Sequence, residues 1–133
     1  MALTTDDITA IQQLYGLYCH AIDDGDGKTF SSCFTPDGYL GGVGKPLVGT
    51  EKLAQFAERT GNSGMGLRHV AAGIYVDGDG DDAQGRAYLV AYNGGDAAKF
   101  RASGRYRDRL RRVDGKWLFV ERRFTPDGGP SAV

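Results

Sequence analysis

The hydrophobic pattern of this chain changes its period once, near residue 67, and that change limits the folds open to it. Apolar residues first recur three and four positions apart over 5–24, which predicts an amphipathic helix that is capped by Thr4 or Thr5 and stopped by Gly25. Shorter helical patterns follow at 28–33 and 50–61, the latter with Thr50 as its expected cap. From residue 67 onward the alternation has a period of two, broken by two Asp/Gly turn signals. We therefore expect four antiparallel strands, at about 67–77, 83–93, 99–113 and 116–125.

Helices followed by long meandering strands predict an α+β domain. Short strand pieces at 39–40 and 47–48 flank a Gly-rich bend, and Thr-Pro-Asp-Gly at 35–38 predicts a turn. The 133 residues suit one core, and neither a repeat nor a linker divides them. We expect a single domain over 1–133 with a loose tail at about 126–133. The strands also carry small residues, which favour a cavity between a bent sheet and the first helix: Ala71, Gly73, Ala87, Ala91, Ala102 and Gly104.

Charge and apolar content exclude several classes of partner. The formal net charge of −1 gives no global reason to expect nucleic acid or an anionic membrane. No apolar stretch approaches the ~20 residues that cross a bilayer, and the N-terminus lacks the basic and apolar segments of an export signal. We expect a cytoplasmic protein without a membrane partner. Cys19 and Cys33 lack Cys-x-x-Cys spacing and are expected to be small core residues.

Asp23 and His69 are the strongest candidates for chemistry. Asp23 falls at the end of the first predicted helix, and His69 near the start of the first long strand. An imidazole oriented by a carboxylate can take and return a proton near neutral pH. The alternative is that Asp23 only terminates the helix and that His69 packs or hydrogen-bonds structurally. A metal site that adds His20 is conceivable, but no recognised ligand spacing supports it, so we expect neither a metal nor a cofactor.

Two further polar residues lie on otherwise apolar surfaces. Tyr18 belongs to the apolar stripe of the first helix, where it either donates a hydrogen bond to a substrate oxygen or packs as a core tyrosine. Arg122 shares its strand parity with Leu118 and Val120, which is unusual for an arginine. It either binds a carboxylate or an enolate oxygen, or this face meets solvent or a surface acid.

The strand at 99–113 alternates arginines with apolar residues. We expect its arginines to form an outward face, with Asp108 and Glu121 nearby: Arg101, Arg105, Arg107, Arg109 and Arg111. We expect the other parity to be buried: Phe100, Ala102, Gly104, Tyr106 and Leu110.

The order and spacing of several segments resemble the SnoaL-like branch of the nuclear transport factor 2-like superfamily. The resembling segments cover nearly the whole chain up to about Thr125: 10–15, 21–26, 34–38, 49–53, 68–70, 104–108 and 114–118. The resemblance implies a cone-shaped α+β fold, with three N-terminal helices packed on a strongly curved, mostly antiparallel sheet. It implies a homodimer or homotrimer as well. The same fold carries many unrelated activities.

Within that family, Asp23 and His69 match the catalytic Asp-His dyad of dehydratase-type members. These include scytalone dehydratase, bile acid 7α-dehydratase and hexachlorocyclohexane dehydrochlorinase. Tyr18 matches a tyrosine of the bile acid enzyme, and Arg122 matches a C-terminal-strand arginine of that enzyme and of the dehydrochlorinase. The second histidine of scytalone dehydratase is missing, because 83–92 contains none. The similar ketosteroid isomerases need a carboxylate near 39–44, and none is there.

We therefore expect a cofactor-independent lyase that dehydrates a small hydrophobic cyclic substrate in a cone cavity. His69 is the expected base and Asp23 its partner, while Tyr18 and Arg122 bind oxygen. Two alternatives stay open. One is an isomerase or cyclase acting on a polyketide or steroid-like ligand. The other is a non-catalytic small-molecule-binding module, which predicts a filled pocket or an Asp23 too far from His69 to hydrogen-bond.

Overall fold

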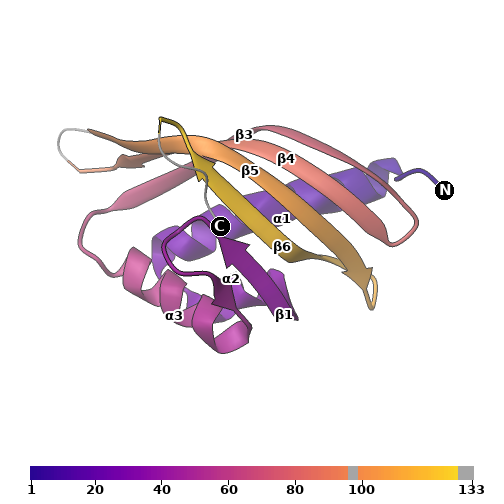
Figure 1. Cartoon of the computed structure of the whole chain (residues 1–133), viewed down its shortest axis with the longest axis horizontal. Helices are drawn as coiled ribbons and strands as arrows, with labels where there is room; N and C mark the ends of the chain where they lie inside the picture. Colours follow the sequence, from indigo (N-terminus) through magenta and orange to yellow (C-terminus); the bar gives the residue numbers. More distant parts are fainter. Residues whose placement is uncertain (96–98, 129–133) are drawn as a thin grey trace.

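Three helices pack on one face of a six-stranded sheet (Figure 1). The computed structural model describes residues 1–95 and 99–128. The helices are α1 (Thr5–Asp24), α2 (Gly27–Ser32) and α3 (Thr50–Gly61). The strands are β1 (Phe34–Gly41), β2 (Leu47–Val48), β3 (Leu67–Asp79), β4 (Asp82–Asn93), β5 (Lys99–Val113) and β6 (Lys116–Pro126). Their order across the sheet is β2-β1-β6-β5-β4-β3, and only β1 and β6 pair in parallel. The expected α+β architecture, helices first and a mostly antiparallel sheet after them, is confirmed.

The long helix α1 lies along the sheet and supplies much of the core (Figure 1). A capping box begins it: the Thr4 side chain accepts from the Asp7 backbone, and Asp7 accepts from the Thr4 backbone. Gly25 ends it in the left-handed conformation, with a φ of 68°. The apolar stripe of the helix is buried against the sheet: Ile11, Leu14, Tyr15, Tyr18 and Ile22. Both free cysteines are buried, as the sequence predicts.

Two local predictions on the helical side are wrong. The segment 35–38 is not a turn between elements but an irregular part of β1, where the pairing with β6 shifts register between Phe34 and Tyr39. Helix α3 is capped by Gly49, with a φ of 92°, and makes no side-chain cap hydrogen bond, so Thr50 is already helical. Of the predicted loose tail, position 126 belongs to β6, and residues 129–133 lie outside the described part of the chain.

Two bulges in the sheet decide which side chains face inward. In the β4–β5 ladder, Ala91 pairs with Ala102 and Tyr92 with Phe100, which leaves Arg101 as an extra residue. In the β5–β6 ladder, Val120 is extra in the same way, between Phe119 and Glu121. Strict alternation therefore fails at both places.

The bulges overturn two predictions from parity, and the prediction for Asp108 is wrong as well. Phe100, expected in the core, is 69% exposed. Arg122 shares the buried face with Phe119 and Phe124 instead of the parity of Val120. Asp108, expected near the outward arginines, is buried between Tyr106 and Leu110 on the inner face.

No helix within residues 1–95 and 99–128 combines the length and apolar character that crossing a bilayer requires.

Candidate functional site

The last turn of α1 and the beginning of β3 bring Asp23 and His69 into contact. His69 Nδ1 lies 2.6 Å from Asp23 Oδ1. The His69 backbone N–H donates to the same carboxylate, at 3.0 Å from Oδ2 and 3.2 Å from Oδ1. Both side chains are about nine-tenths buried. The separation that the binding-module alternative predicts is thus absent.

The carboxylate sets which nitrogen of His69 is free. An ionised carboxylate only accepts hydrogen bonds, so in the neutral imidazole the contact places the proton on Nδ1. Nε2 then carries the lone pair, and the hydrogen bonds that His69 makes to the described residues involve only its backbone N–H and Nδ1. His69 also lines a cavity on the inner face of the sheet. The pair therefore offers an oriented base to whatever occupies that cavity.

The cavity beside His69 has a volume of about 220 Å³ and lies between α1, α3 and the inner face of the sheet. Most of its wall is apolar: Ile22, Val43, Phe56, Leu67, Leu89, Ala91, Ala102 and Phe124. Its polar groups come from His69, Tyr18, Tyr106 and Arg101. An apolar wall with a few placed polar groups is typical of a site for a small organic molecule.

Tyr18 lines this cavity and is also packed in the core. Its ring touches Phe30, Tyr106 and Phe119, with centroids 4.7, 6.1 and 5.8 Å away. Burial raises the pKa of Tyr18 well above its ordinary value, and it raises the pKa of Tyr106 to about 12. Both phenols therefore keep their protons at neutral pH and can donate hydrogen bonds.

Arg122 occupies a different place from the one its parity indicates. It is fully buried, with Nε 3.0 Å from Asp108 Oδ1, and the Tyr15 hydroxyl donates to Asp108 Oδ2. Its guanidinium carbon lies 3.4 Å from the ring centroid of Tyr106 and 4.3 Å from that of Tyr18. Arg122 therefore does not meet solvent, a surface acid or the cavity, whose described lining does not include it. It lies behind the two cavity tyrosines and supports their rings.

Burial and charge act in opposite directions on this second pair. Burial raises the pKa of Asp108, and Arg122 opposes that effect. Burial disfavours the charge of Arg122, but Asp108 and the surrounding tyrosines outweigh it and raise the pKa of Arg122. Nη1 and Nη2 of Arg122 have no hydrogen-bond partner within the part of the chain that the structure describes. Sequence analysis missed Asp108 as an internal residue, although its parity with Tyr106 and Leu110 was an available signal.

A second hollow, of about 350 Å³, reaches the pair from outside. Asp23 and His69 line it together with Cys19, His20, Asp24, Arg68, Val70 and Tyr92. His20 is exposed there and makes no contact with the carboxylate of Asp23 that is short enough for a hydrogen bond. No group of three His, Cys, Asp or Glu side chains within the described residues is arranged to hold a metal ion.

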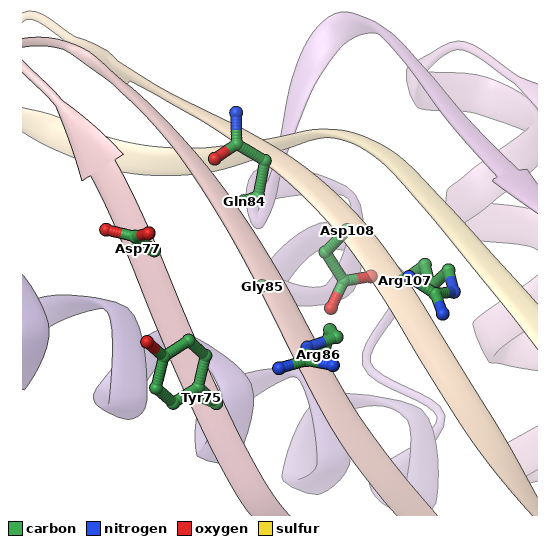
Figure 2. A pocket seen from close by; sticks show the side chains of 7 residues that line it. All are labelled: Tyr75, Asp77, Gln84, Gly85, Arg86, Arg107 and Asp108. Carbon is green, nitrogen blue, oxygen red and sulfur yellow. The ribbon is translucent and has the colours of Figure 1, made fainter.

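A further pocket, of about 330 Å³, opens among strands β3, β4 and β5 (Figure 2). Figure 2 shows Tyr75, Gln84, Arg86 and Arg107 around it. Arg86 lies over the ring of Tyr75, at 5.4 Å from its centroid. These four side chains are exposed and none is a histidine; the carboxyl groups of Asp77 and of the buried Asp108 also line the pocket. This pocket therefore offers no counterpart to the oriented histidine beside the cavity.

Comparison with known proteins gives a family and a fold. A family model described as a SnoaL-like domain matches residues 4–123. Rv3472 from Mycobacterium tuberculosis, a protein of unknown function, is 32% identical, with a TM-score of 0.86 over 92% of this chain and 72% of that one. A Nostoc punctiforme protein of unknown function with a cystatin-like fold is 27% identical, with a TM-score of 0.88 and 97% of each chain covered.

A candidate scytalone dehydratase from Novosphingobium aromaticivorans shares the fold at 18% identity, with a TM-score of 0.77 over 96% of this chain and 87% of that one. Among curated proteins, none matches the chain.

Proposed function

Because the chain belongs to the SnoaL-like domain family, we propose that it is a cofactor-independent lyase that eliminates water from a small cyclic molecule in the cavity beside His69. The observation that carries this proposal is the 2.6 Å contact between Asp23 and His69 Nδ1, which leaves Nε2 free at an apolar cavity. A binding module has no need of an oriented base. The fold shared with a candidate scytalone dehydratase is consistent with the proposal and carries no weight on its own.

The proposed reaction begins at a carbon next to a carbonyl. His69 Nε2 takes the proton, and the C–H electron pair becomes the enolate. Asp23 stabilises the imidazolium that forms, and burial strengthens this interaction because the local dielectric is low. Tyr18 donates a hydrogen bond to the developing enolate oxygen, which its raised pKa allows it to do without losing its proton.

The second step expels the hydroxyl on the neighbouring carbon. The enolate electrons form the new C=C bond while the C–O bond breaks, and the imidazolium returns its proton to the leaving oxygen as water. The protons balance, and no external acid or oxidant is needed. One histidine serves as base and then as acid, which suits a chain without the second histidine of scytalone dehydratase. Arg122 takes no direct part, since it does not reach the cavity.

A panel of cyclic β-hydroxy ketones tests the proposal. Turnover is followed by the absorbance of the conjugated product and by the loss of one water in mass spectrometry. His69→Ala and Asp23→Asn are expected to lower kcat by about 10²- to 10⁴-fold, the usual contribution of a general base. His20→Ala, an exposed histidine in the same turn region as Asp23, is the matched control and is expected to retain full activity.

The outcomes separate the candidate functions. Full activity in either dyad variant removes the pair from the mechanism. Solvent-deuterium exchange at the carbon without loss of water indicates an isomerase or cyclase, because these need the same base but no leaving group. Ligand binding without exchange or elimination in any substrate of the panel indicates the non-catalytic module.

A further inference from the structure

The bulge in β5 brings one arginine to the cavity. Arg101 is the extra residue between Phe100 and Ala102, and it lines the cavity together with Ala102 and His69. The arginines beyond the bulge stay in register: Arg105 pairs with Tyr88 and Arg107 with Arg86, and neither lines this cavity. Arg101 is solvent-exposed as they are, but it also lines the cavity. The bulge thus separates Arg101 from the outward row that its sequence parity predicts.

The charge of Arg101 has no counterpart in the cavity wall. Neither aspartate nor glutamate is among the described residues that line the cavity. No ion pair joins Arg101 to a carboxylate within residues 1–95 and 99–128. His69 is the other basic side chain of the lining, and its Nδ1 is engaged by Asp23. Arg101 is therefore a permanent, solvent-exposed cation at the wall of a mostly apolar cavity, and an anionic ligand group would complement it.

The strand register relates the backbone positions of His69 and of Ala102, the residue that follows Arg101. His69 pairs with Ala91, and Ala91 pairs with Ala102, so the three residues form one row across β3, β4 and β5. Two strand spacings place the backbones of His69 and Ala102 about 10 Å apart. His69 and Arg101 both line the cavity, so a molecule of one or two rings that occupies it can touch both.

We propose that Arg101 determines substrate specificity by binding a carboxylate of the substrate at the cavity, while the ring system lies against the apolar wall beside His69. The inference rests on the proposed function and narrows its substrate class from small cyclic molecules in general to anionic ones. The planar guanidinium can hold a carboxylate through two parallel hydrogen bonds, which fixes the orientation of the ring as well as its charge.

Binding of two matched probes tests Arg101 without requiring turnover. The probes are 2-naphthoate and 2-naphthamide, which share shape and differ in charge, and their affinities are measured by calorimetric titration. The wild-type protein is expected to bind the carboxylate at least about tenfold more tightly than the amide. Arg101→Gln is expected to remove this preference and to leave the amide affinity unchanged. Arg101→Lys is expected to keep part of this preference, because a lysine retains the positive charge but cannot form the two parallel hydrogen bonds of a guanidinium.

Two further variants complete the design. Arg105→Gln removes an exposed arginine of the same strand from outside the cavity and is expected to keep the full preference. Asp23→Asn, in which the proposed elimination fails, is expected to keep it too, so failure of the chemistry and failure of the Arg101 proposal are distinguishable. Equal wild-type affinities, no binding of either probe, an undiminished preference in Arg101→Gln or an equal loss in Arg105→Gln would each overturn the proposal.

Discussion

Two carboxylates in this domain are each held by a basic side chain, and the two pairs differ in what surrounds them. Asp23 and His69 keep about a tenth of their side-chain surface exposed and lie between the cavity and an outer hollow. Asp108 and Arg122 have no exposed side-chain surface and are enclosed by aromatic rings. The first pair leaves one nitrogen lone pair open to a ligand. The second leaves two guanidinium nitrogens without a hydrogen-bond partner among the described residues, but its side chains have no exposed surface. Pairing alone therefore does not make a reactive site.

The enclosed pair depends on a glycine. The Tyr15 hydroxyl reaches Asp108 over Gly85 of β4, where an added Cβ would lie 2.1 Å from the hydroxyl oxygen. Tyr15 belongs to α1, Asp108 to β5 and Arg122 to β6. The contact therefore joins the helix to two strands in the middle of the core, and from there it sets the positions of the cavity tyrosines.

The largest expected effect comes from breaking the enclosed pair. Asp108→Ala leaves the Arg122 charge buried without a partner and is expected to lower the free energy of unfolding by about 3–5 kcal/mol. Asp23→Ala, its counterpart in the open pair, is expected to cost about 1 kcal/mol, because His69 can be hydrated from the outer hollow. Urea denaturation of both variants measures the difference. Equal losses would show that the two pairs do the same structural work.

A double-mutant cycle on the open pair gives the next largest effect. If Asp23 acts only through His69, then His69→Ala, Asp23→Asn and the double variant should lose similar activity, about 10³-fold or ~4 kcal/mol in the barrier. The loss in the double variant is then far smaller than the sum of the single losses. Additive losses, measured as kcat/KM on one substrate, would mean that Asp23 has a role of its own.

The sequence predicts the open pair better than the enclosed one for a physical reason. Asp23 and His69 lie at the end of a helix and near the start of a strand, and both positions follow from the change in hydrophobic period and from Gly25. Their contact could be expected only through the family resemblance, because nothing local sets a separation of 46 positions. Arg101 and Arg122 depend on bulges at residues that no glycine or proline marks. Counting parity along a strand cannot find a bulge set by packing across the sheet.

In Arg122→Gln, the effect of the buried Asp108 on the free energy of unfolding should depend on pH. Burial already raises the pKa of Asp108 in the folded protein, and Arg122 is the main group that opposes the rise, so Arg122→Gln should raise it further. A carboxyl whose folded pKa exceeds its unfolded one stabilises the protein below the unfolded pKa, and this stability is lost as pH rises through the folded pKa. The variant should therefore be destabilised more at about pH 8 than at about pH 5 relative to wild type. If parallel urea titrations give the same loss in free energy of unfolding at both pH values, Arg122 is not what holds down the pKa of Asp108.

The smallest expected effects distinguish the two tyrosines that neighbour Arg122. Tyr15→Phe removes the hydroxyl donor of the buried Asp108 and is expected to lower the free energy of unfolding by about 1.5–3 kcal/mol. Turnover should change little, because Tyr15 is not part of the cavity lining among the described residues.

Tyr18→Phe should have the opposite profile. The ring and its packing against Phe30 and Phe119 are kept, so stability should stay within about 0.5 kcal/mol of wild type. What is lost is the proposed hydrogen bond to the enolate oxygen, and we expect its loss to lower kcat by about tenfold, or ~1.4 kcal/mol in the barrier. KM should change less than kcat, because the oxygen gains most of its negative charge after binding. If Tyr18→Phe lowers stability as Tyr15→Phe does and leaves kcat unchanged, then Tyr18 belongs with the enclosed pair, and another donor, with Tyr106 the nearest in the cavity lining, must serve the substrate.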